Sequence, residues 1–347
     1  MVSTRGTPPE RSVVRPVPID PSGRTGPTRG EAAGPGWRRS TRGLYVPSSV
    51  PADEPEQRIY EASMLLPAYG GVTGWAALRW AWARYFNGTD SAGRLLPVPL
   101  AVMHSDIRGR PGILVTTERL APRDLTDIDG FGITTHVRSV GFEMRYAASV
   151  WDAVIVIDMA AYDDLVTIEE MWAYVATLNG WTGVPQCRAA LALANENSWS
   201  PMETFMRLVW VVLCGFPVPL CNQPVFDRGG HHVGTPDFLD VEAGVVGEYE
   251  GPVHLDGTRR SKDLAREADY RRLGLEYVAM VGADRPALST TVVPRMIEAR
   301  QRARFEAESK RAWTVVPPPW WTSTTTVAAR RSLTERQRER LLRYRAG

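Results

Sequence analysis

Alternating apolar and polar positions mark a sheet-forming region around residue 240. The runs 235–239 and 243–249 are short, rich in β-branched and aromatic residues, and bounded by Gly, Pro and Asp. Runs of this kind are typical of β-strands. The residues between them, 240–244, have the composition of a turn, with Asp240 as a turn residue. A hairpin is therefore predicted here, and a helix is predicted over 263–273.

The segment before this hairpin carries signals for a helix and a second hairpin. Ser200, Pro201 and Glu203 form the pattern of a helix N-cap, a first-turn proline and a capping box. Residues 223–226, a turn at 227–230 and a return strand running to 237 are predicted to form the second hairpin.

The middle of the chain mixes helical and strand patterns. Residues 56–86 have apolar and aromatic positions at helical spacing, with a break at 69–71, and 97–102 and 112–116 read as strands. The tryptophans of the first helical segment are expected in the core rather than stacked on bases. Helices are then predicted from 133 to 178. The chain is thus expected to be α/β (α+β overall), with a mixed, mainly helical region preceding the sheet near residue 240.

The two ends differ in character from the body. The first 36 residues are rich in Pro, Gly and Arg and have no apolar period, so 1–46 is predicted to be largely disordered. The tail, 291–347, is predicted to hold a long basic helix over 294–313, an extended segment at 317–321 and a final helix over 332–344. The paired tryptophans Trp320 and Trp321 are expected to anchor this tail on the body.

Charge is unevenly distributed along the 347 residues. The net charge is +2, but residues 1–50 carry +5 and residues 300–347 carry +8, which leaves −11 for the middle. Basic ends are able to contact nucleic-acid phosphates, so DNA is an expected partner. The alternative is that the ends are solvated tails, since basic tracts alone are weak signals.

The start of the chain lacks the pattern of a signal peptide, and no stretch approaches 18 consecutive apolar residues. The three cysteines, Cys187, Cys214 and Cys221, lack metal-site spacing and suit free thiols in a reducing compartment. A cytoplasmic location without a membrane partner is therefore expected.

Acidic residues concentrate on the predicted hairpin. Side chains repeat every second residue in a strand, so Glu248 and Glu250 share a face, and Asp237 faces them from the neighbouring strand. Carboxylates that converge in this way repel one another unless a cation lies between them. Oxygen ligands suit Mg²⁺ or Mn²⁺, so these three acids are predicted to form a metal site.

This arrangement resembles the PD-(D/E)XK nuclease superfamily, and in particular its branch similar to very-short-patch-repair endonucleases. The sequence Glu248-Tyr249-Glu250-Gly251, followed by His254, matches that branch with Glu in place of Asp. The resemblance implies a restriction-endonuclease-like αβββαβ core over 197–290 and Mg²⁺-dependent hydrolysis of DNA phosphodiester bonds. Asp237 and Glu248 would hold the metal together with the Tyr249 carbonyl group.

The remaining roles follow from the same resemblance. Glu250 would ligate the metal or take a proton, His254 would act near the leaving group, and Lys262 or Arg266 would steady the phosphate. Glu203 would cap its helix or support the catalytic acids. One departure bears on activity, because Glu250 occupies the position of the superfamily lysine, and the chain has only two lysines. A catalytically inactive DNA-binding regulator is therefore the alternative.

A second resemblance covers the region before the nuclease-like segment. The segments 42–47, 56–60 and 71–78 are similar to actinobacterial AbiEi-type antitoxins, which implies an antitoxin-like region over 47–196 and a possible cognate toxin or phage-defence partner. Those antitoxins begin with a DNA-binding winged helix, of which only a wing-like fragment at 37–46 is expected here. His136 and Arg138 of this region are expected to close a turn and to pair with acids such as Glu143.

Overall fold

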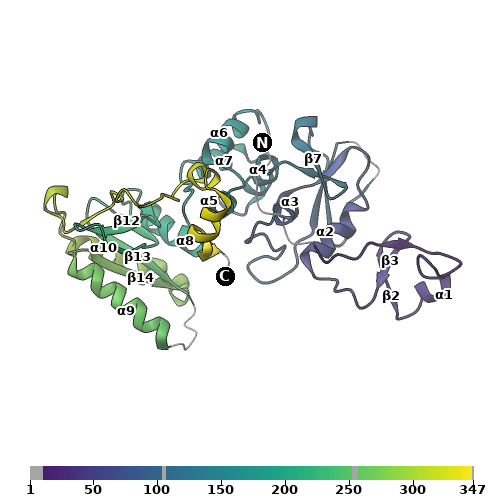
Figure 1. Ribbon diagram of the computed structural model, residues 1–347. Helices are drawn as coiled ribbons and strands as arrows, with labels where there is room; N and C mark the ends of the chain where they lie inside the picture. The colour runs from purple at the N-terminus through teal and green to yellow at the C-terminus, as the bar shows by residue number, and fades with distance from the viewer. Residues whose placement is uncertain (1–10, 104–106, 252–256, 346–347) are drawn as a thin grey trace. The chain divides into compact units, whose positions relative to one another are not determined.

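The computed structural model describes residues 11–103, 107–251 and 257–345; within these ranges, the side chains of 257–263 and of residue 344 are not described. Helices and β-sheets both occur throughout, in agreement with the expected mixture of α and β structure. The chain divides into two compact units, Met1–Ala147 with Glu169–Cys187, and Ala148–Ile168 with Arg188–Gly347 (Figure 1). Each unit is described by itself.

The first unit begins with ordered structure in the segment expected to be largely disordered. Strands β1 (Val17–Pro18), β2 (Trp37–Thr41) and β3 (Leu44–Pro47) form an antiparallel sheet in the order β1-β3-β2, and α1 spans Arg29–Ala32. Polar turns contribute to this order, together with the fully buried Val46 of β3. The Asp20 carboxylate accepts hydrogen bonds from the backbone of 22, 24 and 25, and Thr28 and Glu31 form a reciprocal capping box.

A five-stranded sheet forms the centre of the first unit. Its order is β6-β5-β4-β8-β7, and its strands are β4 (Gly70–Val72), β5 (Val98–Val102), β6 (Ile113–Thr116), β7 (Leu125–Ile128) and β8 (Phe131–Thr134). Helices α2 (Pro55–Ser63) and α3 (Gly74–Trp80) contact this sheet. Trp75 and Trp80 are buried, which confirms their expected place in the core. The predicted break at 69–71 is in fact the start of β4.

The remaining helices of the first unit surround a buried charge cluster. They are α4 (His136–Tyr146), α6 (Ile168–Ala176) and α7 (Val184–Leu191), and η1 (Pro122–Asp124) precedes β7. Arg138 pairs with Glu118 at 2.8 Å, not with Glu143, and Arg145 shares the same carboxylate at 2.6 Å. Arg138 thus pairs with an acid, as expected, but that acid is Glu118 and not Glu143. The Glu143 carboxylate instead accepts the backbone N–H of Trp75 at 2.8 Å.

The second unit is built on a mixed four-stranded sheet, β14-β13-β12-β9. Its strands are β9 (Leu220–Cys221), β12 (Phe238–Asp240), β13 (Val245–Glu250) and β14 (Glu276–Val281). β12 pairs antiparallel with both β9 and β13, whereas β13 and β14 are parallel and are joined by α9 (Gly257–Arg272). The predicted hairpin is confirmed, and the Asp240 carboxylate accepts two backbone N–H groups within its turn.

Two apolar clusters cover the two faces of this sheet. On one face, Phe238 and Val245 pack with residues of α8 (Pro201–Leu208) and α10 (Val293–Arg302), and on the other, Leu239 and Val246 pack with Tyr270 of α9. Helix α5 (Val150–Tyr162) also contacts α8. The short helices η2 (Val209–Leu213), η3 (Gly282–Ala287) and η4 (Leu288–Val292) complete this layer. α10 therefore belongs to the core rather than to a separate tail.

A small second sheet receives the chain after α10. It has the order β11-β10-β15, with β10 (Val225–Asp227), β11 (His232–Gly234) and β15 (Trp313–Thr314), and β10 and β11 form the predicted hairpin. The predicted helix over 294–313 is wrong in length: α10 ends at Arg302, and Ala303 is extended. η5 (Glu308–Lys310) follows. The ring of Trp321 lies 5.0 Å from that of Phe226, so the tryptophan pair does anchor the tail.

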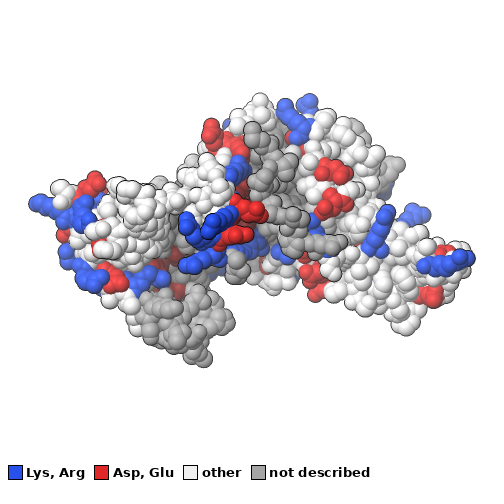
Figure 2. Space-filling view, viewed as in Figure 1, with Lys and Arg blue, Asp and Glu red and all other residues white. Residues whose placement is uncertain are grey.

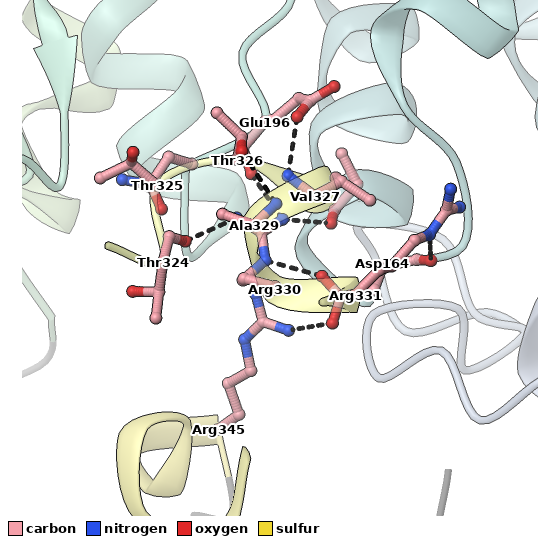
Figure 3. Close-up of polar contacts among 12 residues, drawn as sticks. Asp164, Glu196, Thr324, Thr325, Thr326, Val327, Ala329, Arg330, Arg331 and Arg345 are labelled. Carbon is pink, nitrogen blue, oxygen red and sulfur yellow. Dashed lines mark hydrogen bonds and ion pairs between the residues drawn. The ribbon is translucent and has the colours of Figure 1, made fainter. Parts of the chain in front are cut away.

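The end of the chain is held to the second unit by arginines around one carboxylate. α11 (Val327–Arg331), α12 (Glu335–Leu341) and η6 (Arg343–Arg345) form this segment. Arg330, Arg338 and Arg345 all pair with Asp164, at 2.6, 2.9 and 3.0 Å (Figure 3 shows Arg330 and Arg345 beside it). Arg330 is fully buried and also donates to the carbonyl groups of Ala161 and Glu196.

The three cysteines are free, as expected, with Cys187 and Cys221 buried. None of the helices in the described part of the chain combines the length and the apolar character needed to cross a membrane.

Glu143 makes the stability of the first unit dependent on pH. Burial raises its pKa to about 7, and the N–H of Trp75 only partly offsets this. The folded state therefore binds a proton more tightly than the unfolded state, so the free energy of unfolding falls as pH rises from the ordinary glutamate value through about 7. We expect a loss of up to about 3 kcal/mol across that interval.

Urea unfolding of Glu143→Gln at several pH values checks this, and the pH-dependent loss should disappear in the variant. Glu118 supplies the control. Burial opposes ionisation of Glu118, but hydrogen bonds from Arg145, Tyr146 and Arg138 lower its pKa to about 2. Glu118→Gln should therefore shift stability by a constant amount over the same interval. A wild-type curve that is flat with pH would contradict the prediction.

Arg330 should be the residue on which docking of the C-terminal segment depends. In Arg330→Met, Asp164 keeps only its more exposed arginine partners, and two buried carbonyl groups lose a donor. Breaking a buried pair from one side costs about 3 to 5 kcal/mol, and we expect about 3 because Arg338 and Arg345 remain. Chemical denaturation and limited trypsin digestion measure the effect. Exposed Arg336 gives the control, and an Arg336→Met variant that loses as much stability would count against this role.

Candidate functional site

The pairing of β12 and β13 brings Asp237 opposite Glu248. Phe238 pairs with Gly247, so the preceding residue, Asp237, lies across from Glu248. Side chains alternate between faces along each strand. Glu248 therefore points to the same face as Val246, which is the face covered by α9.

Asp237 is the most perturbed acid of this group. Its Oδ2 accepts the backbone N–H of Tyr249 at 2.6 Å. Burial raises its pKa well above the ordinary value, and the negative charges of Glu203 and Glu248 raise it further, against the opposing effects of the Tyr249 N–H and Arg266. Asp237, Glu203, Glu248 and Arg266 thus form one electrostatic cluster, which we call the acid cluster.

Glu203 enters the acid cluster from α8, and it also serves its own helix. Ser200 caps the helix by accepting the N–H of Glu203 at 3.2 Å, as predicted. The Glu203 Oε2 atom accepts from the N–H of Trp199 and from the side-chain amide of Asn222, both at 2.7 Å. Burial raises the pKa of Glu203 above its ordinary value. Capping and proximity to Asp237 are therefore compatible roles of the same side chain.

Glu248 is bound to a cation from α9. Arg266 donates to its Oε2 at 2.6 Å; the Glu248 side chain is 9% exposed, and that of Arg266 is 38% exposed. Arg266 thus reaches back from the helix to the strand. Its guanidinium group is more accessible than the carboxylate that it holds.

The remaining predicted site residues are Glu250, which lies two positions after Glu248 on β13, and His254 and Lys262. The Glu250 carboxylate lies 3.5 Å from the hydroxyl of Tyr277 on β14. His254 lies outside the described residues, and Lys262 lies in α9 in the stretch whose side chains are not described. The structure therefore assembles Asp237, Glu248, Glu203 and Arg266.

Two residues that sequence reasoning missed border the acid cluster. Tyr270 is fully buried, its hydroxyl has no hydrogen-bond partner among the described residues, and burial and the charge of Glu248 raise its pKa. It lies four positions after Arg266, a spacing that places both on one side of the helix and was the available signal. Asn222 binds Glu203 from a distant segment and had no such signal.

The donors of the acid cluster suit a hard cation in type. Asp237 accepts the Tyr249 N–H through Oδ2, and Glu203 accepts the N–H of Trp199 and the Asn222 amide through Oε2. Carboxylate oxygens of this kind are the donors that Mg²⁺ prefers. A divalent cation would also relieve the repulsion from Glu203 and Glu248, which adds to the effect of burial on the pKa of Asp237. Within the described part of the chain, no group of three or more His, Cys, Asp or Glu is placed to hold a metal. In donor type, Asp237 and Glu203 are the carboxylates that a cation would contact, because Glu248 is held by Arg266.

No family model, characterised protein or solved structure matches the chain.

Replacement of Asp237 should stabilise the protein. Asn keeps an oxygen for the N–H of Tyr249 and removes the carboxylate that is disfavoured beside Glu203 and Glu248. The raised pKa means that wild-type stability falls as pH rises past the ordinary aspartate value, so the gain of Asp237→Asn should grow with pH. We expect a gain of about 1 kcal/mol near neutral pH, within the range that single stabilising substitutions commonly give.

Asp240→Asn is the matched control for this measurement. Asp240 lies at the other end of the same strand, and it pairs with Arg300 at 2.9 Å. Its replacement should lower stability in urea unfolding. If both variants destabilised the protein equally, Asp237 would not be an electrostatically strained acid.

Proposed function

We propose that this protein is an Mg²⁺-dependent, nuclease-like hydrolase of DNA phosphodiester bonds, with the acid cluster as its site. The observation that carries the proposal is the meeting of Asp237, Glu203 and Glu248 beside Arg266. Like charges are brought together there at a cost in stability, and perturbed acids of this kind concentrate at functional sites.

The connectivity of the second unit supports the same proposal. The order α8, β9, β12, β13, α9, β14, with an antiparallel β12–β13 pair and a parallel β13–β14 pair, is the order that a restriction-endonuclease-like αβββαβ core would have. The hairpin β10–β11 is inserted between β9 and β12. A fold supplies an argument by analogy only, so the site carries the functional argument.

The residues of the acid cluster divide the work of binding and orientation. Asp237 and Glu203 would hold the cation, and the N–H of Tyr249 fixes the Asp237 carboxylate in place. When bound, Mg²⁺ would polarise the scissile phosphate and lower the pKa of the attacking water. Arg266, with its partly exposed guanidinium group, would move from Glu248 to the phosphate. Glu248 would then be available as a further ligand or as a proton acceptor.

A DNA-binding protein that does not cut is the second candidate. Two observations favour it. Glu250 stands in place of the motif lysine, and the carboxylate of Glu248 is already paired with Arg266. This candidate needs the fold and a phosphate-binding surface but no metal, and it includes an antitoxin-like or phage-defence regulator with a cognate partner.

Metal titration with a proton count tests the first candidate without relying on activity. Because the pKa values of Asp237 and Glu203 are raised, Mg²⁺ or Mn²⁺ binding should release protons. Calorimetry in two buffers of different ionisation enthalpy measures that release. Binding should be lost in Asp237→Asn and kept in Asp269→Asn, an acid on α9 that pairs with Arg272.

Nicking of supercoiled plasmid is measured with the same proteins. We expect metal-dependent nicking by the wild type and by Asp269→Asn, and a loss of at least about 100-fold in Asp237→Asn. Wild-type protein that neither binds metal nor nicks DNA would overturn the hydrolase proposal. DNA binding in EDTA would then support the second candidate.

A further inference from the structure

A basic depression lies in the first unit, remote in sequence from the acid cluster. It has a volume of about 330 Å³, and its lining includes four arginines, Arg39, Arg42, Arg58 and Arg110; Glu61 is the one acid among the described residues that line it. The arginines come from the β2–β3 hairpin, from α2 and from the residues before β6. The depression thus gathers positive charge from three separate segments.

The carboxylate of Glu61 in this lining is already paired with an arginine. Glu61 accepts hydrogen bonds from Arg38 at 3.0 and 2.6 Å and from Gln57 at 2.8 Å. Asp53 is a further nearby acid, and its charge acts on Arg58. The lining arginines therefore outnumber the acidic charges around them.

The arginines of the depression have no acidic side chain as a hydrogen-bond partner among the described residues, unlike the buried arginines of the protein. The buried arginines Arg138, Arg145, Arg207 and Arg330 each form an ion pair with an acid from another segment of the chain. By contrast, the exposed side chains of Arg42 and Arg110 make no hydrogen bond or ion pair with any described residue, and Arg39 contacts only the carbonyl group of Thr41 at 3.3 Å.

One member of the set is fixed in position by its surroundings. Arg58 donates to the carbonyl groups of Gly88 and Leu96 and lies over the ring of Trp75 at 5.3 Å. Carbonyl groups hold a guanidinium without cancelling its charge. The hydroxyl of Thr41, also in the lining, has no hydrogen-bond partner among the described residues. The depression therefore combines a pre-positioned cation with movable ones.

An apolar strip continues from the basic depression. A second depression shares Arg58, Arg110 and Ile113 with the first and is also lined by Leu95 and Leu114. These two leucines are 53% and 44% exposed. A chain of alternating phosphates and apolar ring faces matches this combination, because phosphates pair with arginine and bases or sugars contact apolar side chains.

We propose that these two depressions form a groove that binds the phosphodiester backbone of a nucleic-acid strand. Arg39, Arg42 and Arg110 contact phosphates, and Leu95 and Leu114 contact the sugars or bases. The groove needs neither the acid cluster nor a metal ion, so it does not rest on hydrolysis. It gives the first unit a nucleic-acid contact of its own.

The C-terminal arginines offer a matched comparison. Figure 2 shows basic side chains gathered over the C-terminal helices, with acidic side chains beside them. Several of these arginines serve Asp164 (Figure 3), whereas Arg336 and Arg340 are exposed and outside the groove. Replacing Arg336 and Arg340 removes the same charge as replacing Arg42 and Arg110, without touching the groove.

Binding of a fluorescent 20-nucleotide single strand to the full-length chain in EDTA tests the proposal by anisotropy. Arg42→Gln with Arg110→Gln should weaken binding by about tenfold or more and reduce the salt dependence of log K by about 1.4, the value for two phosphate contacts to a single strand. Arg336→Gln with Arg340→Gln should change Kd by less than about twofold. Asp269→Asn, which changes an acid outside both the groove and the acid cluster, should bind as the wild type does.

Three results would overturn the proposal. These are no binding by the wild type, equal weakening in the groove and control variants, or an unchanged salt dependence in the groove variant. Circular dichroism of both double variants verifies that they are folded. Loss of nicking with binding intact would concern the acid cluster alone, so the two proposals fail separately.

Discussion

The close contact between Phe238 and Gly247 sets the register on which the second unit depends. A Cβ atom on Gly247 would lie 2.3 Å from the Phe238 ring, so a residue with a side chain there would push the two strands apart or out of register. A shift by one residue would exchange the two faces of the sheet. Asp237 would then no longer face Glu248. Val245 would leave the apolar cluster on the α8 and α10 face for the one on the α9 face, and Val246 would move the opposite way.

Gly234 likewise leaves room for an aromatic side chain, that of Tyr270 on α9. A Cβ atom on Gly234 would lie 2.3 Å from the Tyr270 hydroxyl group. Tyr270 is therefore able to enter the core beside β11, and with it α9 is held at the sheet face where Arg266 meets Glu248. The acid cluster thus depends on two places where a missing side chain lets an aromatic ring approach the backbone. Apolar packing therefore brings these acidic side chains together against their mutual repulsion.

Sequence reasoning located the local parts of the second unit well, because their signals are local. The turn at Asp240, the N-cap at Ser200 and the hairpin at 227–230 each depend on neighbouring residues. The failures involve long-range pairing or local chemistry without apolar periodicity. Order near Asp20 arises from side-chain hydrogen bonds that a hydrophobic pattern does not reveal. Arg138 paired with Glu118 rather than Glu143, because tertiary packing decided between two acids, and α10 ended at Arg302 despite a continuous basic sequence.

The same limit explains what the sequence revealed about charge. The number of arginines along the sequence indicates two basic ends. The structure shows that the arginines of these two ends differ in their partners. Asp164 engages three arginines of the C-terminal end in docking that segment, whereas Arg39 and Arg42 of the N-terminal end remain exposed beside Arg58 and Arg110. Asp164 cancels only one of these three positive charges, but its ion pairs hold the three guanidinium groups in place, and their side chains are only 0 to 22% exposed. A phosphate therefore has limited access to them. Arg39, Arg42 and Arg110 are exposed and have no acidic partner among the described residues, so we expect any contact with phosphate to depend on the pairing and exposure of each arginine rather than on its position in the sequence.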